Sequence, residues 1–181
     1  MILTNDLKKK YTMRKLVLIF LFAASGCKIY SFSGASIDPK VKTLKLDNFD
    51  NKAPFVEPTL SPALLAAVQK QVNQKTHLTL TNSDNADYEV GGYITNYSVG
   101  TSGISNGQAS SSTLKATFHL IFKNHLDPTG KTVTPADFED DVTTSVDFPA
   151  TSSFSQVEAS LVTQVTTNMS NDIFNRLFSS W

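Results

Sequence analysis

The amino-acid sequence predicts an α+β fold, a two-layer sandwich in which a four-stranded mixed sheet packs against two helices. Residues 114–122 alternate between apolar and polar side chains, as a strand with one buried face does. Residues 154–181 carry apolar side chains at spacings of three or four, which is typical of a long helix with one apolar face. A shorter stretch with helical spacing, residues 61–73, precedes them. The order along the chain is therefore β-α-β-β-β-α, and both helices are expected on the same face of the sheet.

The first two predicted elements are a strand over residues 41–49 and a helix over residues 61–73. Apolar and polar side chains roughly alternate in the strand. The helix is expected to begin with Ser61 as its N-cap and Pro62 at its first position, where a missing N–H has no consequence. One apolar stripe with a spacing of four then follows: Leu64, Val68 and Val72.

The second predicted strand covers residues 88–99, and a shorter strand over residues 77–80 is an open alternative just before it. Gly91 and Gly92 lie inside the strand, where glycine indicates a bulge or a close approach of backbones. Residues 100–112 are rich in Gly, Ser and Asn and offer little apolar area to bury. We therefore predict a mobile loop there.

The last two strands are predicted over residues 114–122 and 138–148, joined by a loop with turn residues. Ser153 and Ser155 each precede Gln or Glu by three residues, so either can begin the final helix with a capping box. The helix should bury one long stripe, formed by Val157, Leu161, Val165, Met169, Ile173 and Leu177, with Phe174, Phe178 and Trp181 beside it.

Residues 1–26 read as an export signal. Five basic side chains precede a nine-residue apolar run, which is too short to cross a hydrocarbon core that needs roughly 20 helical residues. Small residues then lead to Cys27, the only cysteine in the sequence. This order is that of a secretory signal, and Ala-Ser-Gly-Cys resembles the lipobox of bacterial lipoproteins. We expect cleavage before Cys27 and lipid on its sulfur. An ordinary signal peptide that leaves a free thiol is the alternative.

The lipid anchor would attach the protein to a membrane, with residues 27–40 as a tether and residues 41–181 as one domain. Stable anchoring takes two or more acyl chains, and a lipobox implies them. Lys28 and Ile29 follow the cysteine, with no acidic residue before Asp38. Among lipoprotein signals this favours the outer membrane, with the protein facing the periplasm.

Removal of the signal changes the charge of the chain. Residues 1–26 hold five basic residues and one acidic residue, so 11 Lys and Arg and 15 Asp and Glu remain. The mature chain therefore has a net charge of −4. A nucleic-acid-binding protein would show a basic stripe, so nucleic acid is not an expected partner.

Short motifs along the mature chain resemble, in the same order, those of the short form of the LptE lipoproteins, the outer-membrane partners of lipopolysaccharide assembly. They are residues 30–37, Phe49 with Asn51, Leu60-Ser61, residues 92–97, Phe122 with Asn124, Val157-Glu158, residues 172–175 and Trp181. The resemblance implies a small mixed sheet packed against two helices. It also implies a non-enzymatic role, inside the lumen of the LptD β-barrel as a plug that helps the barrel assemble and binds lipopolysaccharide. Large outer-membrane barrels have polar interiors that a polar protein can occupy.

The resemblance implies basic residues that meet lipopolysaccharide phosphates, and such residues are few in this sequence. Arg176 is the only arginine of the mature chain. Lys115, Lys123 and Lys131 lie on the best-defined strand and the loop after it, and we take them as the candidate lipopolysaccharide-binding residues. Solvated lysines on a polar strand face are the alternative.

No cofactor, metal or catalytic residue is predicted. His77, His119 and His125 lack the spacing of a metal motif such as H-E-x-x-H. The acidic run at residues 137–141 lacks the pattern of a calcium loop, so solvated charges are expected there. Two other functions remain open. One is an auxiliary periplasmic lipoprotein of an ABC-type lipid transport system, and the other is a cell-envelope hydrolase.

Overall fold

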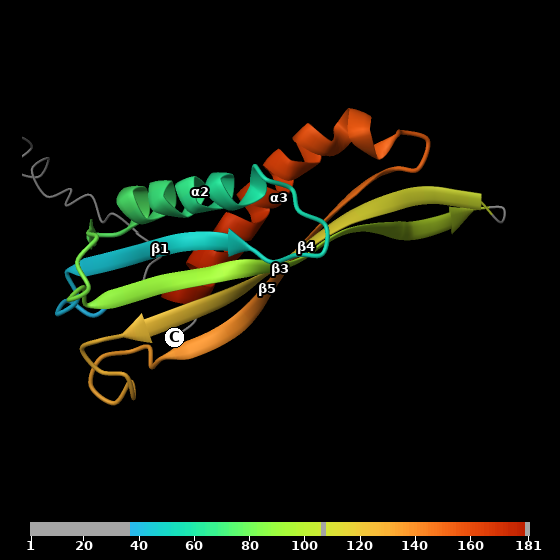
Figure 1. Cartoon of the computed structure of the whole chain (residues 1–181). Coiled ribbons are helices and arrows are strands. Elements are labelled where there is room, and N and C mark those ends of the chain that lie inside the picture. Colours follow the sequence, from blue (N-terminus) through green and yellow to red (C-terminus); the bar gives the residue numbers. More distant parts are fainter. Residues whose placement is uncertain (1–36, 106–107, 180–181) are drawn as a thin grey trace, which may run out of the picture. The chain divides into compact units, whose positions relative to one another are not determined.

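One mixed sheet of five strands is covered on one face by two helices (Figure 1). The computed structural model describes residues 37–105 and 108–179. All of them belong to the second of the two units into which the chain divides, Ser33–Trp181. The elements, in chain order, are β1 (Thr43–Asn51), α2 (Leu60–Lys75), β2 (Thr79–Leu80), β3 (Tyr88–Ser105), β4 (Gln108–Asn124), β5 (Phe138–Pro149) and α3 (Phe154–Phe178).

The expected class of fold is confirmed, but the sheet has five strands rather than four. Its strand order is β2-β1-β3-β4-β5, and β1 is parallel to both of its neighbours, whereas the other pairs are antiparallel. The additional strand is β2, in which Thr79 and Leu80 pair with Thr43 and Leu44. Two residues are too few for an alternation of apolar and polar side chains to be recognised. The sequence therefore indicated this strand only as an open possibility.

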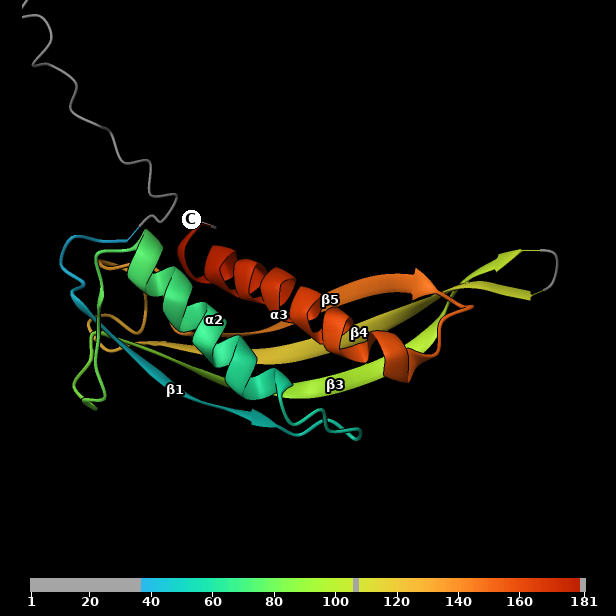
Figure 2. The same cartoon turned by 90° about the horizontal axis from the view of Figure 1, so that it is seen from above.

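The predicted mobile loop over residues 100–112 is wrong. β3 continues to Ser105 and β4 begins at Gln108, so residues 100–105 and 108–112 form the outer part of a long hairpin. The ladder of backbone hydrogen bonds in such a hairpin needs no apolar side chain, and Ser and Thr side chains do not prevent it. The hairpin extends past the ends of both helices (Figure 2).

The core lies between the sheet and the helices. The alternation expected for β4 is confirmed, because Leu114, Ala116, Phe118, Leu120 and Phe122 are all at most 1% exposed. The predicted stripes of both helices face them. Leu64, Val68 and Val72 of α2 are fully buried, and so are Val165, Met169, Ile173 and Leu177 of α3.

The start of α2 differs from the prediction, whereas α3 begins where one of the two predicted caps places it. α2 begins at Leu60 with Thr59 as N-cap, and the hydroxyl of Ser61 instead donates to the backbone oxygen of Asp50. α3 begins after Ser153, as one of the two capping boxes predicts, but no side chain caps its N-terminus. Neither helix combines the length and hydrophobicity that a membrane span requires, within the part of the chain that the structure describes.

Cys27, the signal peptide and most of the tether lie outside the described residues, as does Trp181. Their predicted roles therefore stay predictions.

Candidate functional site: the open face of the sheet

The face of the sheet turned away from the helices, here called the open face, carries charged side chains from four neighbouring strands. Strand alternation brings them there, because the residues between them on β4 and β5 point to the helix side of the sheet. The open face includes Lys45 and Asp47 of β1, Glu89 and Tyr93 of β3, His119, Ile121 and Lys123 of β4, and Glu139 and Asp141 of β5.

Glu89 is the centre of an ion-pair network at one end of this face. It pairs in the ladder with Lys45 on one side and Lys123 on the other. Its carboxylate lies 2.8 Å from the Nζ of Lys123, 3.3 Å from the Nε2 of His125 and 3.8 Å from the Nζ of Lys45. The hydrogen bond from Lys123, with smaller effects of His125 and Lys45, holds the pKa of Glu89 below its ordinary value. Glu89 thus stays ionised although its side chain is only 14% exposed.

His119 lies in the middle of the open face between an aromatic ring and two carboxylates. Its direct ladder neighbours are Tyr93 and Asp141. Its Nδ1 is 2.8 Å from Asp141, its Nε2 is 3.1 Å from Glu139, and its ring centroid is 5.1 Å from that of Tyr93. Hydrogen bonds to Asp141 and then to Glu139 raise the pKa of His119 above its ordinary value. Both acids therefore favour the imidazolium form.

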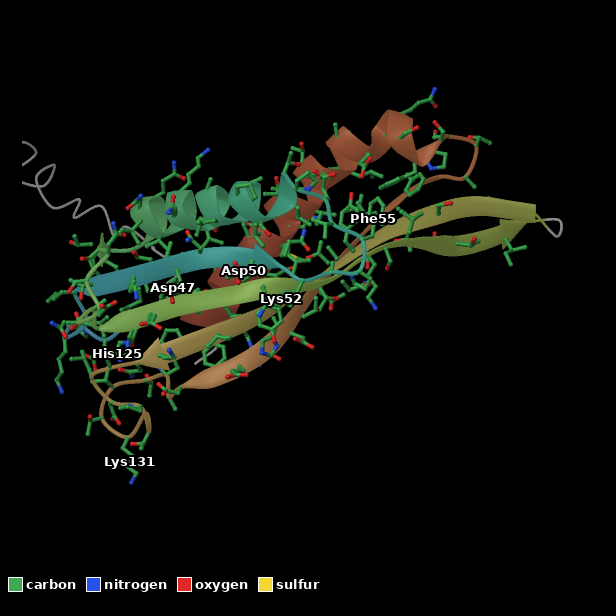
Figure 3. All side chains as sticks on the ribbon, viewed as in Figure 1. Asp47, Asp50, Lys52, Phe55, His125 and Lys131 are labelled. Atoms are coloured by element: carbon green, nitrogen blue, oxygen red, sulfur yellow. The ribbon has the colours of Figure 1, made fainter. Side chains whose placement is uncertain are left out.

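A cavity of about 260 Å³ opens on this face over Gly91 and Gly92. Lys52 and Lys123 line it together with acidic and aromatic side chains, among them Asp47, Asp50, Glu89 and Tyr93. The Nζ of Lys52 lies 3.8 Å from the ring centroid of Tyr93, a cation–π contact. Asp47, Asp50 and Lys52 follow one another along β1 and its end (Figure 3). The cavity can therefore receive a polar group that carries charges of either sign.

The structure does not bring the three candidate lysines into one cluster. Lys115 and Lys123 share the open face, but eight residues of β4 separate them, which is about 26 Å at 3.3 Å per residue. Lys123 is already paired with Glu89, and Lys131 lies on the loop after β4 (Figure 3). Lys45 and Lys52 were missed by the sequence prediction. The alternation of β1, in which Lys45 lies between Leu44 and Leu46, was the signal that could have placed Lys45 on this face.

The loop that carries Lys131 is held by the side chains of Asn124 and Asp127, and by the hydroxyl of Tyr88, which donates to the backbone oxygen of Thr134. The fully buried amide of Asn124 donates to the backbone oxygens of Val133 and Pro135, both at 2.7 Å. Its oxygen accepts from the backbone N–H groups of Leu126 and Asp127. The carboxylate of Asp127 accepts in turn from Thr129, Thr132 and Val133. Lys131 therefore lies on a loop whose backbone is fixed by hydrogen bonds.

The acidic run at residues 137–141 divides between two faces and has structural partners. Asp137 accepts from the backbone N–H of Asn124, Glu139 and Asp141 face His119, and Asp140 pairs with Arg176 of α3. Within residues 37–105 and 108–179, no group of three or more His, Cys, Asp or Glu side chains is arranged to hold a metal ion.

A mixed sheet with one face under two helices and the other exposing charge defines a small two-layer α+β domain. The model of the family described as "LptE: Lipopolysaccharide-assembly" matches residues 41–177. The chain belongs to this family, a family of outer-membrane-associated lipoproteins.

Solved structures of three other proteins are similar to this chain at low sequence identity, and the first of them has the same fold. A protein from Xanthomonas campestris is 10% identical with a TM-score of 0.51, and the alignment covers 80% of this chain and 90% of that one. A minor lipoprotein from Acinetobacter baumannii is 14% identical with a TM-score of 0.49, covering 76% and 92%. The rare lipoprotein B from Shewanella oneidensis is 8% identical with a TM-score of 0.45, covering 74% and 89%. No curated protein sequence matches the chain significantly.

Proposed function

We propose that this protein is a non-enzymatic outer-membrane lipoprotein that plugs an LptD-type β-barrel, supports its assembly, and binds lipopolysaccharide on its way to the outer leaflet. The observation that carries the proposal is the family match over residues 41–177, which spans the whole sheet and both helices up to Leu177. Cys27 would supply the anchor to the membrane that holds the barrel.

The open face supports the proposed place in a barrel lumen. The interior of a large outer-membrane barrel is polar, so a protein that fills it needs a polar surface rather than a lipid-binding one. The ion pairs of Glu89 and His119 give the sheet such a surface. The uncharged hairpin beyond them exposes Ser98, Thr101, Ser102 and Ser110, together with the apolar side chains of Val99 and Ile104.

Co-purification tests the barrel partner. The full chain with a C-terminal affinity tag is purified from detergent-solubilised outer membranes, beside an unrelated tagged outer-membrane lipoprotein. We expect a large β-barrel protein to elute in stoichiometric amount with this chain and not with the control. Co-elution of the subunits of an ABC-type lipid transporter instead would contradict the proposal and favour the alternative function.

We further propose that Lys115, Lys123 and Lys131 meet lipopolysaccharide phosphates. Lysine acts on phosphate as a point charge, so each residue contributes little alone and the three are changed to Gln together. The control triple variant changes Lys40, Lys70 and Lys75, which are also exposed, and loses the same charge elsewhere. We expect weaker lipopolysaccharide binding only for the first variant. The difference should shrink at high salt, because exposed charges are screened within about 10 Å at 0.1 M. Equal binding by both variants at low salt would exclude these lysines.

A further inference from the structure

The outer part of the β3–β4 hairpin has a free edge, which is formed by residues 98–104 of β3. The pairing of β1 with β3 ends at Ile94, so these residues pair only with β4 within the part of the chain that the structure describes. All of them except Gly103 are exposed. In an antiparallel pair, alternate residues direct their backbone N–H and C=O groups away from the partner strand. The free edge therefore presents backbone hydrogen-bonding groups that the described residues do not use.

The free edge lacks the usual protection against pairing with another strand. Exposed edges are normally protected by charged side chains, by proline or by a covering segment. No charged residue and no proline occurs between Glu89 and Lys115. A ribbon of two strands is also only marginally stable in water. The outer hairpin, which extends past both helices (Figure 2), would thus gain stability from a third strand.

The apolar side chains of this strand segment lie on one face. Side chains that pair across a ladder point to the same side of the sheet, and successive pairs alternate between the two sides, which continues through the bulges around Gly103. Tyr97, Val99 and Ile104 therefore share the helix side of the sheet with the buried Leu114. Val99 is 45% exposed and Ile104 is 74% exposed. The free edge thus lies beside apolar side chains that water still reaches.

An apolar cavity of about 510 Å³ adjoins the inner end of the free edge. Three aromatic rings line it, and the centroid of the Tyr97 ring is 5.9 Å from that of Phe55 and 6.4 Å from that of Phe154. Ser98 and Val99 of the free edge line it as well. Phe55, which follows β1 and lies close to where the hairpin leaves the helices (Figure 3), is 59% exposed. An apolar side chain of a segment paired with the edge can therefore enter this cavity.

The chemistry of the edge distinguishes a polypeptide from a lipid. An acyl chain could fill the apolar cavity, but it offers no hydrogen bond to the backbone groups beside it. Covering those groups with hydrocarbon would leave them without partners, which is strongly unfavourable. A second extended backbone supplies donors and acceptors with the spacing of a ladder. Because the edge carries no charge, an uncharged segment complements it best: a charge brought there would lose its hydration without gaining a partner.

We propose that the free edge of β3 binds an extended, uncharged segment of a partner polypeptide, which places one large apolar side chain in the cavity beside Tyr97. The segment adds a strand next to the outer half of β3, on the side where β1 pairs with the inner half. Strand addition of this kind is a common mode of peptide recognition, in which backbone hydrogen bonds give affinity and side-chain pockets give specificity.

Two synthetic peptides test the site on the full chain in detergent. The first has blocked ends and a central phenylalanine, flanked on each side by threonine, valine and serine in that order. The second carries N-methyl groups on its three central residues, which removes backbone donors but keeps every side chain. We expect the first peptide to bind at least about tenfold more tightly, as the loss of two or three hydrogen bonds of ordinary net strength implies. It should also slow the hydrogen exchange of residues 98–104. Equal binding of the two peptides would overturn the proposal.

Two matched pairs of variants locate the binding. Val99→Lys places a charge beside the free edge, and Leu126→Lys places one on the loop after β4, at a side chain of equal exposure. Phe55→Ala removes one wall of the cavity, whereas Val56→Ala shortens an exposed neighbour that does not line it. Val99→Lys and Phe55→Ala should each weaken binding of the first peptide about fivefold or more, the effect of one lost apolar contact. Equal effects of the control variants would overturn the proposal.

Other occupants of the edge would give different results, and each would overturn the proposal. Slow exchange of residues 98–104 in the free chain would mean that the protein covers its own edge. A dimer in sedimentation that Val99→Lys dissociates would identify a second copy of the chain as the occupant. Binding of a fatty acid that requires Phe55, without binding of either peptide, would identify a lipid. The triple lysine variant described above should bind the first peptide normally, so this site and the proposed lipopolysaccharide contact fail independently.

Discussion

Gly92 of β3 lies directly against the ring of Phe118 of β4. A Cβ on Gly92 would be 2.6 Å from the ring and closer still to the backbone oxygen of His119. The φ of Gly92 is also +150°, a backbone conformation that residues with a side chain rarely adopt. The close backbone approach predicted from Gly91-Gly92 is thus found at the second glycine, because Phe118 packs where its side chain would be.

We expect Gly92→Ala to lower the free energy of unfolding by about 2 kcal/mol or more, since a methyl group here forces packed neighbours apart. Gly100→Ala is the control, because nothing lies within 4 Å of a Cβ at Gly100. Urea unfolding of both variants measures the difference. A Gly92→Ala variant as stable as the control would contradict the packing described for this strand pair.

A substitution at Leu161 tests whether the predicted apolar face of α3 is buried. Its side chain is 3% exposed, so Leu161→Asp would bury a charge without a partner, and the stability should fall by about 3–5 kcal/mol. Asn168→Asp places the same group on the exposed side of α3 and should change little. Circular dichroism melts compare the two variants. Similar melting temperatures would show that α3 does not bury this face.

His119 should make stability depend on pH. Its pKa is raised in the folded state above the ordinary value of 6.5 by Asp141 and Glu139, so the folded protein binds the proton more tightly than the unfolded chain. The resulting stabilisation is fully present below the ordinary pKa and is lost as the pH rises through the raised pKa.

The wild-type melting temperature should therefore fall more between pH 6 and pH 8 than that of His119→Gln. His77→Gln serves as the control, because that histidine contacts the backbone oxygen of Val41 rather than a carboxylate. An equal fall in wild type and His119→Gln would mean that the pairs with Asp141 and Glu139 contribute nothing in solution.

Cys27→Ala should leave a longer precursor without lipid that does not reach the outer membrane. The order of basic segment, apolar run and small residues before the cysteine is the reason for this expectation. Metabolic labelling with a fatty-acid probe, followed by membrane fractionation, measures both effects. Label on the mutant equal to that on the wild type would refute lipidation at this residue.

The parts of the fold that the sequence predicted are those in which apolar periodicity determines burial. The alternation from Leu114 to Phe122 and the stripe from Val157 to Leu177 each specify one buried face, and both are confirmed except that Val157 is only half-buried. Elements held mainly by backbone hydrogen bonds were missed. Residues 100–112 show no regular alternation of apolar and polar side chains, so their composition suggested a loop. The two residues of β2 are too few to show any alternation, so the sequence did not decide whether this strand exists.

The candidate site was less predictable because it depends on strand register. That Glu89 pairs with Lys45 and with Lys123 follows from how three strands align, and a shift by one residue would separate them. Lys123 was correctly placed on a polar strand face, but its partner on β3 could not be found from the spacing of residues in one strand. A cavity of about 520 Å³ between the start of α2 and the N-terminal half of α3 likewise brings together residues far apart in the sequence, such as Glu57 and Glu158.

The hydrogen bonds of Asn124 determine how the loop that carries Lys131 separates from the sheet. Because this one amide holds both ends of residues 126–135, the loop cannot detach by fraying from its tip. Its backbone amides should exchange with deuterium as a cooperative group, together with the end of β4, and trypsin should reach Lys131 only when that group opens. The loop then behaves kinetically as part of the sheet rather than as a surface connection.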